Sequence, residues 1–395
     1  MKSLVYLDNN ATTPLAPFLK NPLIQKMEEW GNPSSVHYAG RGPKKIIREA
    51  RQNLAKLLKV SPLELIFTSG GSEANNLALQ GIFFSQILPH LLSSFKNKDT
   101  VFRNRFIISA VEHPSVFKTA EYLKTFGLKL DILPINKNGQ VDLNQLQSLL
   151  GEDVAMASIM YANNETGHIF PINKISKMLK SCGALLHCDA VQAFGKLPLN
   201  LNTLGADLVS FSSHKVYSLK GSGLLYVKKG VHLNALIQGG GQERFRRAGT
   251  ENTLSIASLG LMAEHMLKEK LISNYFTQMQ NLRDFMEEEI IKNIKIATII
   301  GKDCARLPNT SNILFSNLNG DSLLVSLDLK SISLSTGSAC SSGSSEPSSV
   351  LKAMGYSDEQ ANSSLRISLG WQTSKKDIVF FVKELIAVVK HLSQL

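Results

Sequence analysis

The chain has 395 residues, of which 43% are hydrophobic and 19% charged, values that are ordinary for a globular protein long enough for two domains. The formal net charge of +11 invites a nucleic-acid hypothesis, but the basic residues are scattered without a basic and aromatic platform, so nucleic acid is not the expected ligand. The sequence contains no apolar run of about 18 residues or more, so a membrane span is not predicted. The four cysteines have neither zinc-site nor disulfide-framework spacing, which indicates no metal site and fits a reducing cytoplasm.

The first part of the chain contains two polar turns and a helix. Residues 6–14 (YLDNNATTP) read as a short strand that breaks into a turn. Residues 31–35 (GNPSS) form another turn, which places the amide of Asn32 on a loop. From Lys44 onward, apolar residues at helical spacing predict an amphipathic helix.

A short strand over 65–68 then runs into the small residues of 69–76 (SGGSEANN), where a helix is expected to begin. A strand, a small-residue turn and a helix N-terminus together present backbone N–H groups to a phosphate, which would involve Gly71 and Ser72. A plain helix cap by Ser72 explains the pattern equally well. Residues 88–104 are polar and basic, and we expect an exposed loop there.

Apolar runs at 106–108, 155–160, 185–188 and 207–211 alternate with helical stretches. This alternation predicts an α/β fold with a mainly parallel sheet covered on both faces. Ligands gather at the carboxyl ends of such strands, and polar residues follow each run. These residues are His113 with Glu112, Asn164 with its neighbours, Asp189 with Gln192, and Ser212 with His214 and Lys215.

Lys215 lies between two apolar runs, because residues 220–223 turn back into 224–227. A lysine held between two strands would be partly desolvated, which lowers its pKa and favours it as an amine nucleophile of the kind that forms a Schiff base. A lysine at a strand end with its ammonium in water is the alternative.

The last third of the chain mixes strands with helices after a predicted domain boundary near residue 255. Residues 331–349 are rich in serine and glycine, so this segment should be mobile, and it carries Cys340. The thiol of Cys340 is expected to be accessible, although an inert loop cysteine is the alternative. The other three cysteines are expected to be small buried hydrophobes.

In this order, the motifs YLDNNATTP, GNPSS, TSGGSEANN, EHPS, NNETG, HCDAVQ, SFSSHK, RRAGTEN and STGSACSSGSSEPS resemble those of the cysteine desulfurases, pyridoxal-phosphate enzymes of the aminotransferase class V group. The resemblance runs from about Tyr6 to about Trp371. It implies the aminotransferase-like fold, with a large domain (21–255) around a mainly parallel seven-stranded sheet. A smaller α+β C-terminal domain (256–395) would carry the cysteine loop, with residues 1–20 packed against it.

The resemblance also implies roles for individual residues. Lys215 matches the Schiff-base lysine, Asp189 the partner of the pyridine nitrogen, and His113 the histidine stacked on the cofactor ring. Asn164 and Gln192 match amides near the phenolic oxygen of the ring. The phosphate cup matches Gly71, Ser72, Ser212 and His214, with Thr250 given by the second subunit of a homodimer. Arg366 matches the arginine that grips the substrate carboxylate, and Asn32 is a second match to that role.

Cys340 matches the nucleophile, and the sequence GSAC (337–340) resembles the long-loop group. The implied activity converts L-cysteine to L-alanine and leaves a persulfide on Cys340, for iron–sulfur cluster assembly or tRNA thiolation, with an acceptor or scaffold protein as partner. A selenocysteine lyase or another class V lyase, which would not need Cys340, is the nearest alternative. A non-catalytic sulfur-relay protein with the same fold is the other.

Overall fold

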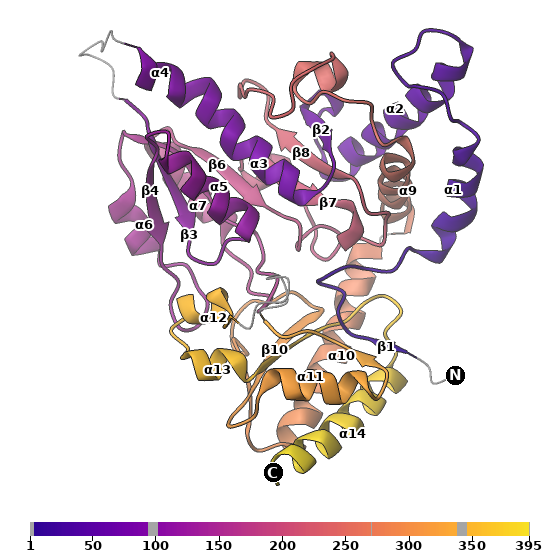
Figure 1. Ribbon diagram of the computed structural model, residues 1–395, viewed down its shortest axis with the longest axis vertical. Helices are drawn as coiled ribbons and strands as arrows, with labels where there is room; N and C mark the ends of the chain where they lie inside the picture. The colour runs from indigo at the N-terminus through magenta and orange to yellow at the C-terminus, as the bar shows by residue number, and fades with distance from the viewer. Residues whose placement is uncertain (1–3, 94–101, 270, 338–345, 395) are drawn as a thin grey trace.

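The computed structural model describes residues 4–93, 102–269, 271–337 and 346–394, and the chain forms a larger and a smaller part (Figure 1). The larger part is built on a seven-stranded sheet in the order β2-β8-β7-β6-β5-β3-β4. Its strands are β2 Leu65–Thr68, β3 Arg105–Ser109, β4 Lys129–Leu133, β5 Val154–Ser158, β6 Leu185–Asp189, β7 Leu208–Ser212 and β8 Gly223–Val227. Strands β7, β6, β5, β3 and β4 run parallel, and β8 is antiparallel to both of its neighbours. The predicted mainly parallel, seven-stranded sheet is confirmed.

Helices cover both faces of this sheet, which is why its strands are apolar on both sides. Ile107 and Phe211 pack in one core layer with α2, α7 and α9, whereas Phe106 and Leu208 pack in the other layer with α3 and α5. The helices of the larger part are α1 Lys20–Met27, α2 Tyr38–Leu58, α3 Gly71–Ile82, α4 Leu88–Leu92, α5 Pro114–Lys124, α6 Leu143–Leu149, α7 Ile172–Ser181, α8 Leu201–Leu204 and α9 Thr253–Glu269.

The smaller part has a sheet and a core of its own. Strands β9 Ala297–Ile299, β10 Thr310–Phe315 and β12 Ser364–Ser368 form an antiparallel sheet, and β1 Val5–Tyr6 pairs in parallel with β11 Ile332–Ser333. Its helices are α11 Gly320–Asp328, α12 Ser349–Ala353, α13 Asp358–Asn362 and α14 Lys375–Leu392. Val5 and Leu7 join the core of this part, so the first strand of the chain packs with its last third.

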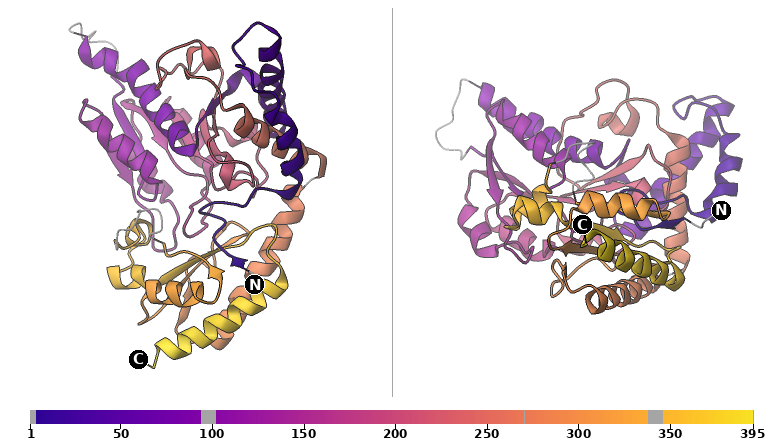
Figure 2. Two further views of the ribbon diagram at one scale, coloured as in Figure 1. Left: turned by 45° about the vertical axis from the view of Figure 1, so that its right-hand side comes forward. Right: turned by 60° about the horizontal axis from the view of Figure 1, so that its bottom comes forward.

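Two consecutive helices connect the parts. Ile256 and Met262 of α9 pack in the core of the larger part, while Met286 and Ile290 of α10 (Leu271–Asn293) pack in the smaller core. Figure 2 shows α10 running from one part into the other. The domain boundary near residue 255 remains a prediction, and this packing favours a later division, within α10.

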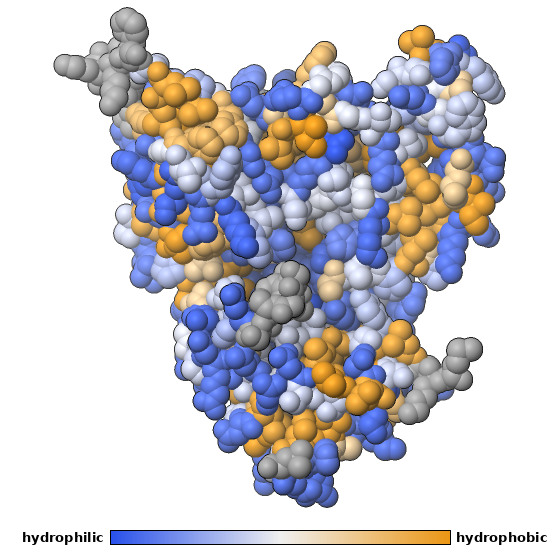
Figure 3. All heavy atoms as spheres, in the orientation of Figure 1, coloured by the Kyte–Doolittle hydropathy of each residue, from blue (hydrophilic) through white to orange (hydrophobic). Residues whose placement is uncertain are grey.

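The segment 88–104 differs from the expected loop at its start. Helix α3 continues through a π-helical stretch, Phe83–Ile87, into α4, so residues 88–92 are helical, and residues 94–101 lie outside the described part. Buried Phe83 and Ile87 hold this extension against the core. Within the described ranges, no helix is both long enough and apolar enough to cross a membrane. Exposed apolar side chains form separate groups among hydrophilic ones on the face seen in Figure 3.

Candidate active site

A cavity of about 240 Å³ lies where β5, β6 and β7 end and α3 begins. Parallel strands place the residues that follow them at one edge of the sheet, so segments far apart in the sequence meet there. Nine of the predicted site residues line this cavity: Gly71, Ser72, His113, Asn164, Asp189, Gln192, Ser212, His214 and Lys215.

Lys215 ends a short 3-10 turn, Ser213–Lys215, that follows β7 directly. Its Nζ donates hydrogen bonds to the carbonyl oxygens of Asn10 at 2.6 Å and Ala11 at 2.7 Å. The turn itself is fixed because the Ser213 hydroxyl donates to the Ser222 carbonyl at 2.7 Å. The amine therefore faces the cavity between the larger part and the N-terminal segment of the chain.

Asp189 is the last residue of β6, is buried, and also lines the cavity. The Asn75 amide donates to its Oδ2 at 2.7 Å, and the Val191 backbone N–H donates to its Oδ1 at 2.9 Å. These two donors fix the carboxylate plane. A carboxylate held in this way can accept a further hydrogen bond from a protonated ring nitrogen in the cavity.

Two histidines in the lining are held in the neutral state. His113 caps α5: the Ser115 N–H donates to its Nδ1 at 3.1 Å, so a neutral ring carries its hydrogen on Nε2. Burial lowers the pKa of His113, and the Lys215 charge adds to this while Asp189 opposes it. Burial, with the charges of Lys215 and Lys220, lowers the pKa of His214 to about 4. The Nε2–H group of neutral His113 can therefore donate a hydrogen bond.

The N-terminus of α3 meets the requirements of an anion site. The helix cap is Gly70, which has no capping side chain, so Ser72 lies inside the helix and the Ser72 cap is wrong. The first N–H groups of a helix lack intrahelical partners and favour negative charge. A Cβ at Gly71 would come within 2.8 Å of the Val191 side chain, so only glycine brings the backbone this close to the strand ends. With Ser212 and His214 nearby in the lining, these residues fit a phosphate group.

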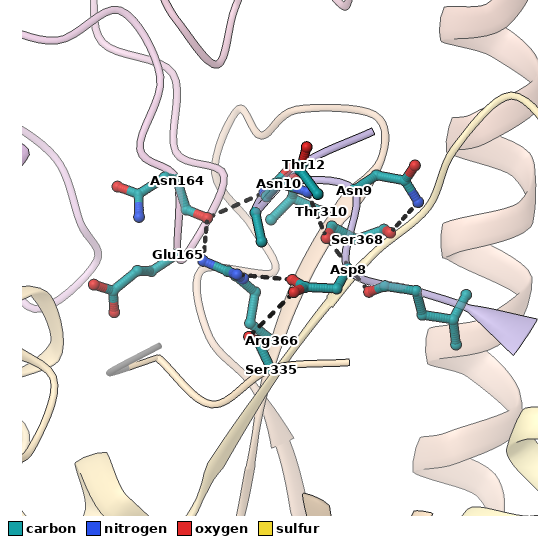
Figure 4. A network of polar contacts seen from close by, with 12 residues as sticks. Asp8, Asn9, Asn10, Thr12, Asn164, Glu165, Thr310, Ser335, Arg366 and Ser368 are labelled. Carbon is teal, nitrogen blue, oxygen red and sulfur yellow. Dashed lines mark hydrogen bonds and ion pairs between the residues drawn. The ribbon is translucent and has the colours of Figure 1, made fainter. Parts of the chain in front are cut away.

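The smaller part closes the other side with a buried ion pair (Figure 4). Arg366 of β12 is 1% exposed and donates to Asp8 Oδ1 at 2.8 Å. It also reaches the carbonyl of Asn164, which lines the cavity, at 3.5 Å. Arg366 itself lies beyond the cavity lining, with its Nε buried and lacking a partner among the described residues.

Glu165 lies next to this pair and is buried. Burial raises the pKa of Glu165 to about 7, although the Ser348 hydroxyl and the Arg366 charge oppose the shift. Ser348 donates to Glu165 Oε2, and Asn312 of β10 donates to its backbone carbonyl at 3.3 Å. This glutamate therefore joins the loop after β5 to the smaller part.

Besides Arg366, two predicted residues of the described ranges lie outside the cavity lining of this single chain. Asn32 is exposed and caps its own turn, accepting from the Ser34 N–H at 2.9 Å. Thr250 is exposed, and its predicted contact belongs to a second subunit. Cys340 lies outside the described residues, as do its neighbours 338–345.

Sequence reasoning missed three residues that hold the site together. Asn75 lies one helical turn after Gly71, and that spacing could have indicated that its amide faces Asp189. Asn10 contacts Lys215, Gln192 and Lys196, but its contacts join segments that no local pattern connects. The burial of Lys196 was not predicted, because most lysines are exposed to solvent.

The chain is similar to known proteins over most of its length. The aminotransferase class-V family model matches residues 5–381. Because this match spans most of the chain, the protein belongs to the aminotransferase class-V family.

Curated relatives narrow the class further. The chain is 40% identical over 400 residues to "Cysteine desulfurase IscS" of Dictyoglomus turgidum, covering 99% of this chain and 96% of the relative. It is 38% identical to "Cysteine desulfurase NifS" of Azotobacter vinelandii, covering 98% and 93%. Among solved structures, one described as a NifS-like protein superposes with a TM-score of 0.88 at 33% identity, covering 99% of this chain and 100% of that one. Within its family, the chain belongs to the cysteine desulfurases.

Proposed function

We propose that this protein is a pyridoxal-phosphate-dependent cysteine desulfurase that converts L-cysteine to L-alanine and transfers the sulfur to Cys340. The observation that carries this proposal is the meeting of an amine, a carboxylate and a neutral imidazole, from Lys215, Asp189 and His113, around one cavity beside a helix N-terminus. The relatives named as cysteine desulfurases support the same reaction.

The chain would hold the cofactor through groups with distinct tasks. Lys215 would bind its aldehyde carbon, and Asp189 would keep its ring nitrogen protonated. When bound, the cofactor supplies an electron sink for the substrate Cα. The phosphate cup would comprise Gly71, Ser72, Ser212 and His214, with Thr250 from the partner of a homodimer. Asn164 and Gln192 would face the phenolic oxygen, and His113, stacked on the ring, would move a proton.

Arg366 and Asn32 are proposed to bind the carboxylate of L-cysteine. Arg366 is paired with Asp8 beyond the cavity lining, so binding of the substrate carboxylate would require its guanidinium to turn from Asp8 towards the cavity. A planar fork is suited to such recognition. The complex of SspA with cysteine, a solved structure at 30% identity and TM-score 0.76 that covers 92% of this chain and 98% of that one, supports cysteine as the substrate.

Cys340 would act as the nucleophile of sulfur transfer. Its thiolate attacks the substrate sulfur, the carbon–sulfur bond breaks with its electron pair left on carbon, and protonation there gives alanine. A persulfide remains on Cys340 for an acceptor or scaffold protein, in the cytoplasm, for iron–sulfur cluster assembly or tRNA thiolation.

The proposal is tested by adding pyridoxal phosphate to the purified protein and recording its visible absorbance before and after L-cysteine. Lys215→Ala is expected to abolish the absorbance of the lysine-bound cofactor, whereas Lys220→Ala, at an exposed lysine five residues on, leaves it unchanged. Cys340→Ser is expected to keep the absorbance and lose alanine release. Full alanine release by Cys340→Ser would point to a lyase, and wild-type protein without the absorbance would point to a sulfur relay.

A further inference from the structure

Lys196 is a buried lysine behind the wall of the cavity. It is 6% exposed, lies in the turn region between β6 and α8, and is not part of the cavity lining. Its Nζ donates to Gln192 Oε1 at 2.6 Å and to Asn10 Oδ1 at 2.9 Å. Among the ion pairs of the described ranges, none includes Lys196, so two neutral amides take the place of a carboxylate.

The direction of these two contacts is fixed by chemistry. A lysine amine carries at least two hydrogens in either protonation state, and an ammonium has no acceptor at all. With Lys196 protonated, both amide oxygens must therefore face its amine.

With their oxygens turned to Lys196, both amides turn their NH₂ groups away from it. Gln192 Nε2 donates to the Asn10 carbonyl at 3.0 Å on the cavity side, and that carbonyl also accepts from Lys215 at 2.6 Å. Asn10 Nδ2 donates to the Asn164 carbonyl at 3.1 Å and to Thr310 Oγ1 at 2.9 Å. Thus one amine orients the donors that border the cavity.

Burying a lysine amine without a counter-charge costs free energy of desolvation. Burial lowers the pKa of Lys196 well below its usual range, and the nearby charges of Lys215 and Arg366 lower it further. The two amide contacts do not include a counter-charge that would offset this. A buried methionine would fill similar space without that penalty.

We propose that Lys196 is a positioning residue: it holds the Gln192 amide with its NH₂ group directed into the cavity, ready to donate to an oxygen of the bound cofactor. This inference rests on the proposed function, because it takes pyridoxal phosphate as the ligand. Without Lys196, the Gln192 amide can rotate and present its oxygen instead, so that two acceptors face each other.

The test is a titration of cofactor-free protein with pyridoxal phosphate, followed by absorbance. Lys196→Met is expected to weaken binding about tenfold, the usual effect of losing a hydrogen bond from a charged or strongly polar group, and to shift the visible maximum of the loaded protein. Lys196→Gln retains one donor for Gln192 and is expected to stay within about threefold of wild type. Lys228→Met is the matched control, since Lys228 pairs with Asp207 away from the cavity.

A double variant of Lys196 and Gln192 distinguishes a positioning role of Lys196 from a purely structural one. In a Gln192→Ala background, Lys196→Met should lose less than about twofold, because the amide it orients is gone. The proposal is overturned if the affinity losses of Lys196→Met and Gln192→Ala multiply in the double variant. It is also overturned if Lys196→Met binds pyridoxal phosphate as tightly as wild type. Gln192→Glu keeps the acceptor for Lys196 but no NH₂ group, so unchanged affinity there overturns it even where Lys196→Met does not fold. Failure of the wild-type protein to bind pyridoxal phosphate refutes the proposed function instead.

Discussion

The two sides of the candidate active site hold their charged groups in different ways. On the larger part, the Asp189 carboxylate is fixed by the Val191 N–H, two residues further on, and by Asn75 on a neighbouring helix. On the smaller part, Arg366 is held by Asp8, which is 358 residues away in the chain. The first arrangement exists once a strand and a helix have formed, whereas the second needs both ends of the chain in place. We therefore expect changes on the first side to affect chemistry and changes on the second side to affect stability.

The largest expected effect is that of Asp189→Asn. It removes the negative charge from the larger side but leaves the shape, and alanine formation from L-cysteine should fall by about a thousandfold, as for loss of one preorganised electrostatic contact. Asp207→Asn is the control, because Asp207 accepts from the Leu186 N–H before β7, at the other end of the sheet. A loss of similar size in Asp207→Asn would show that the effect comes from folding.

Asp8→Ala tests the other side of the comparison. It leaves the guanidinium of Arg366 buried without its counter-charge, which should lower the free energy of unfolding by about 3 kcal/mol. Urea unfolding of the variant measures this loss, with Asp303→Ala on an exposed turn as the control. Equal stability of Asp8→Ala and wild type would contradict the idea that the smaller side depends on this pair.

Glu165, which lies next to the pair of Asp8 and Arg366, should make the stability of the protein depend on pH. Its pKa is raised by burial from 4.5 to about 7, so the folded state binds this proton more tightly than the unfolded state does. Its contribution to stability is full below pH 4.5 and is lost as the pH rises towards about 7. Between pH 5 and 8, wild type should lose about 2 kcal/mol relative to Glu165→Gln.

Thermal unfolding of both proteins across that pH range measures the difference. Ser348→Ala provides a matched comparison, since it removes the hydroxyl that donates to Glu165 but leaves the carboxyl group in place. A constant difference between wild type and Glu165→Gln at all pH values would refute the titration of this group.

The smallest expected effect concerns the cap of α14. Ser374 and Asp377 form a capping box, and Ser374→Ala should cost about 1 kcal/mol. Because α14 packs in the smaller core and not at the cavity, binding of pyridoxal phosphate should be unchanged. Urea unfolding and the absorbance titration measure the two quantities on the same sample, and weakened binding would show that the smaller core controls the cavity.

The two sides of the site also differ in how well the sequence predicts them. His113, Asp189 and Lys215 follow apolar strands, and parallel topology brings strand ends together, so residues alone indicated the larger side. The pairing of Asp8 with Arg366 and the burial of Lys196 depend on the packing of segments hundreds of residues apart. No local period or turn signal encodes such contacts. The helix over 88–92 was missed because its polar and basic surroundings resemble a loop, while buried Phe83 and Ile87 extend α3 into it.

The pairing of β1 with β11 has a consequence for biosynthesis. Val5 pairs with Ile332, so β1 has no partner until the chain has been made as far as residue 332, more than 300 residues later. The seven-stranded sheet can form during that interval, because its strands end at Val227. β1 therefore stays unpaired until Ile332 has been made, and a fragment starting at residue 256 would lack this strand of the smaller part.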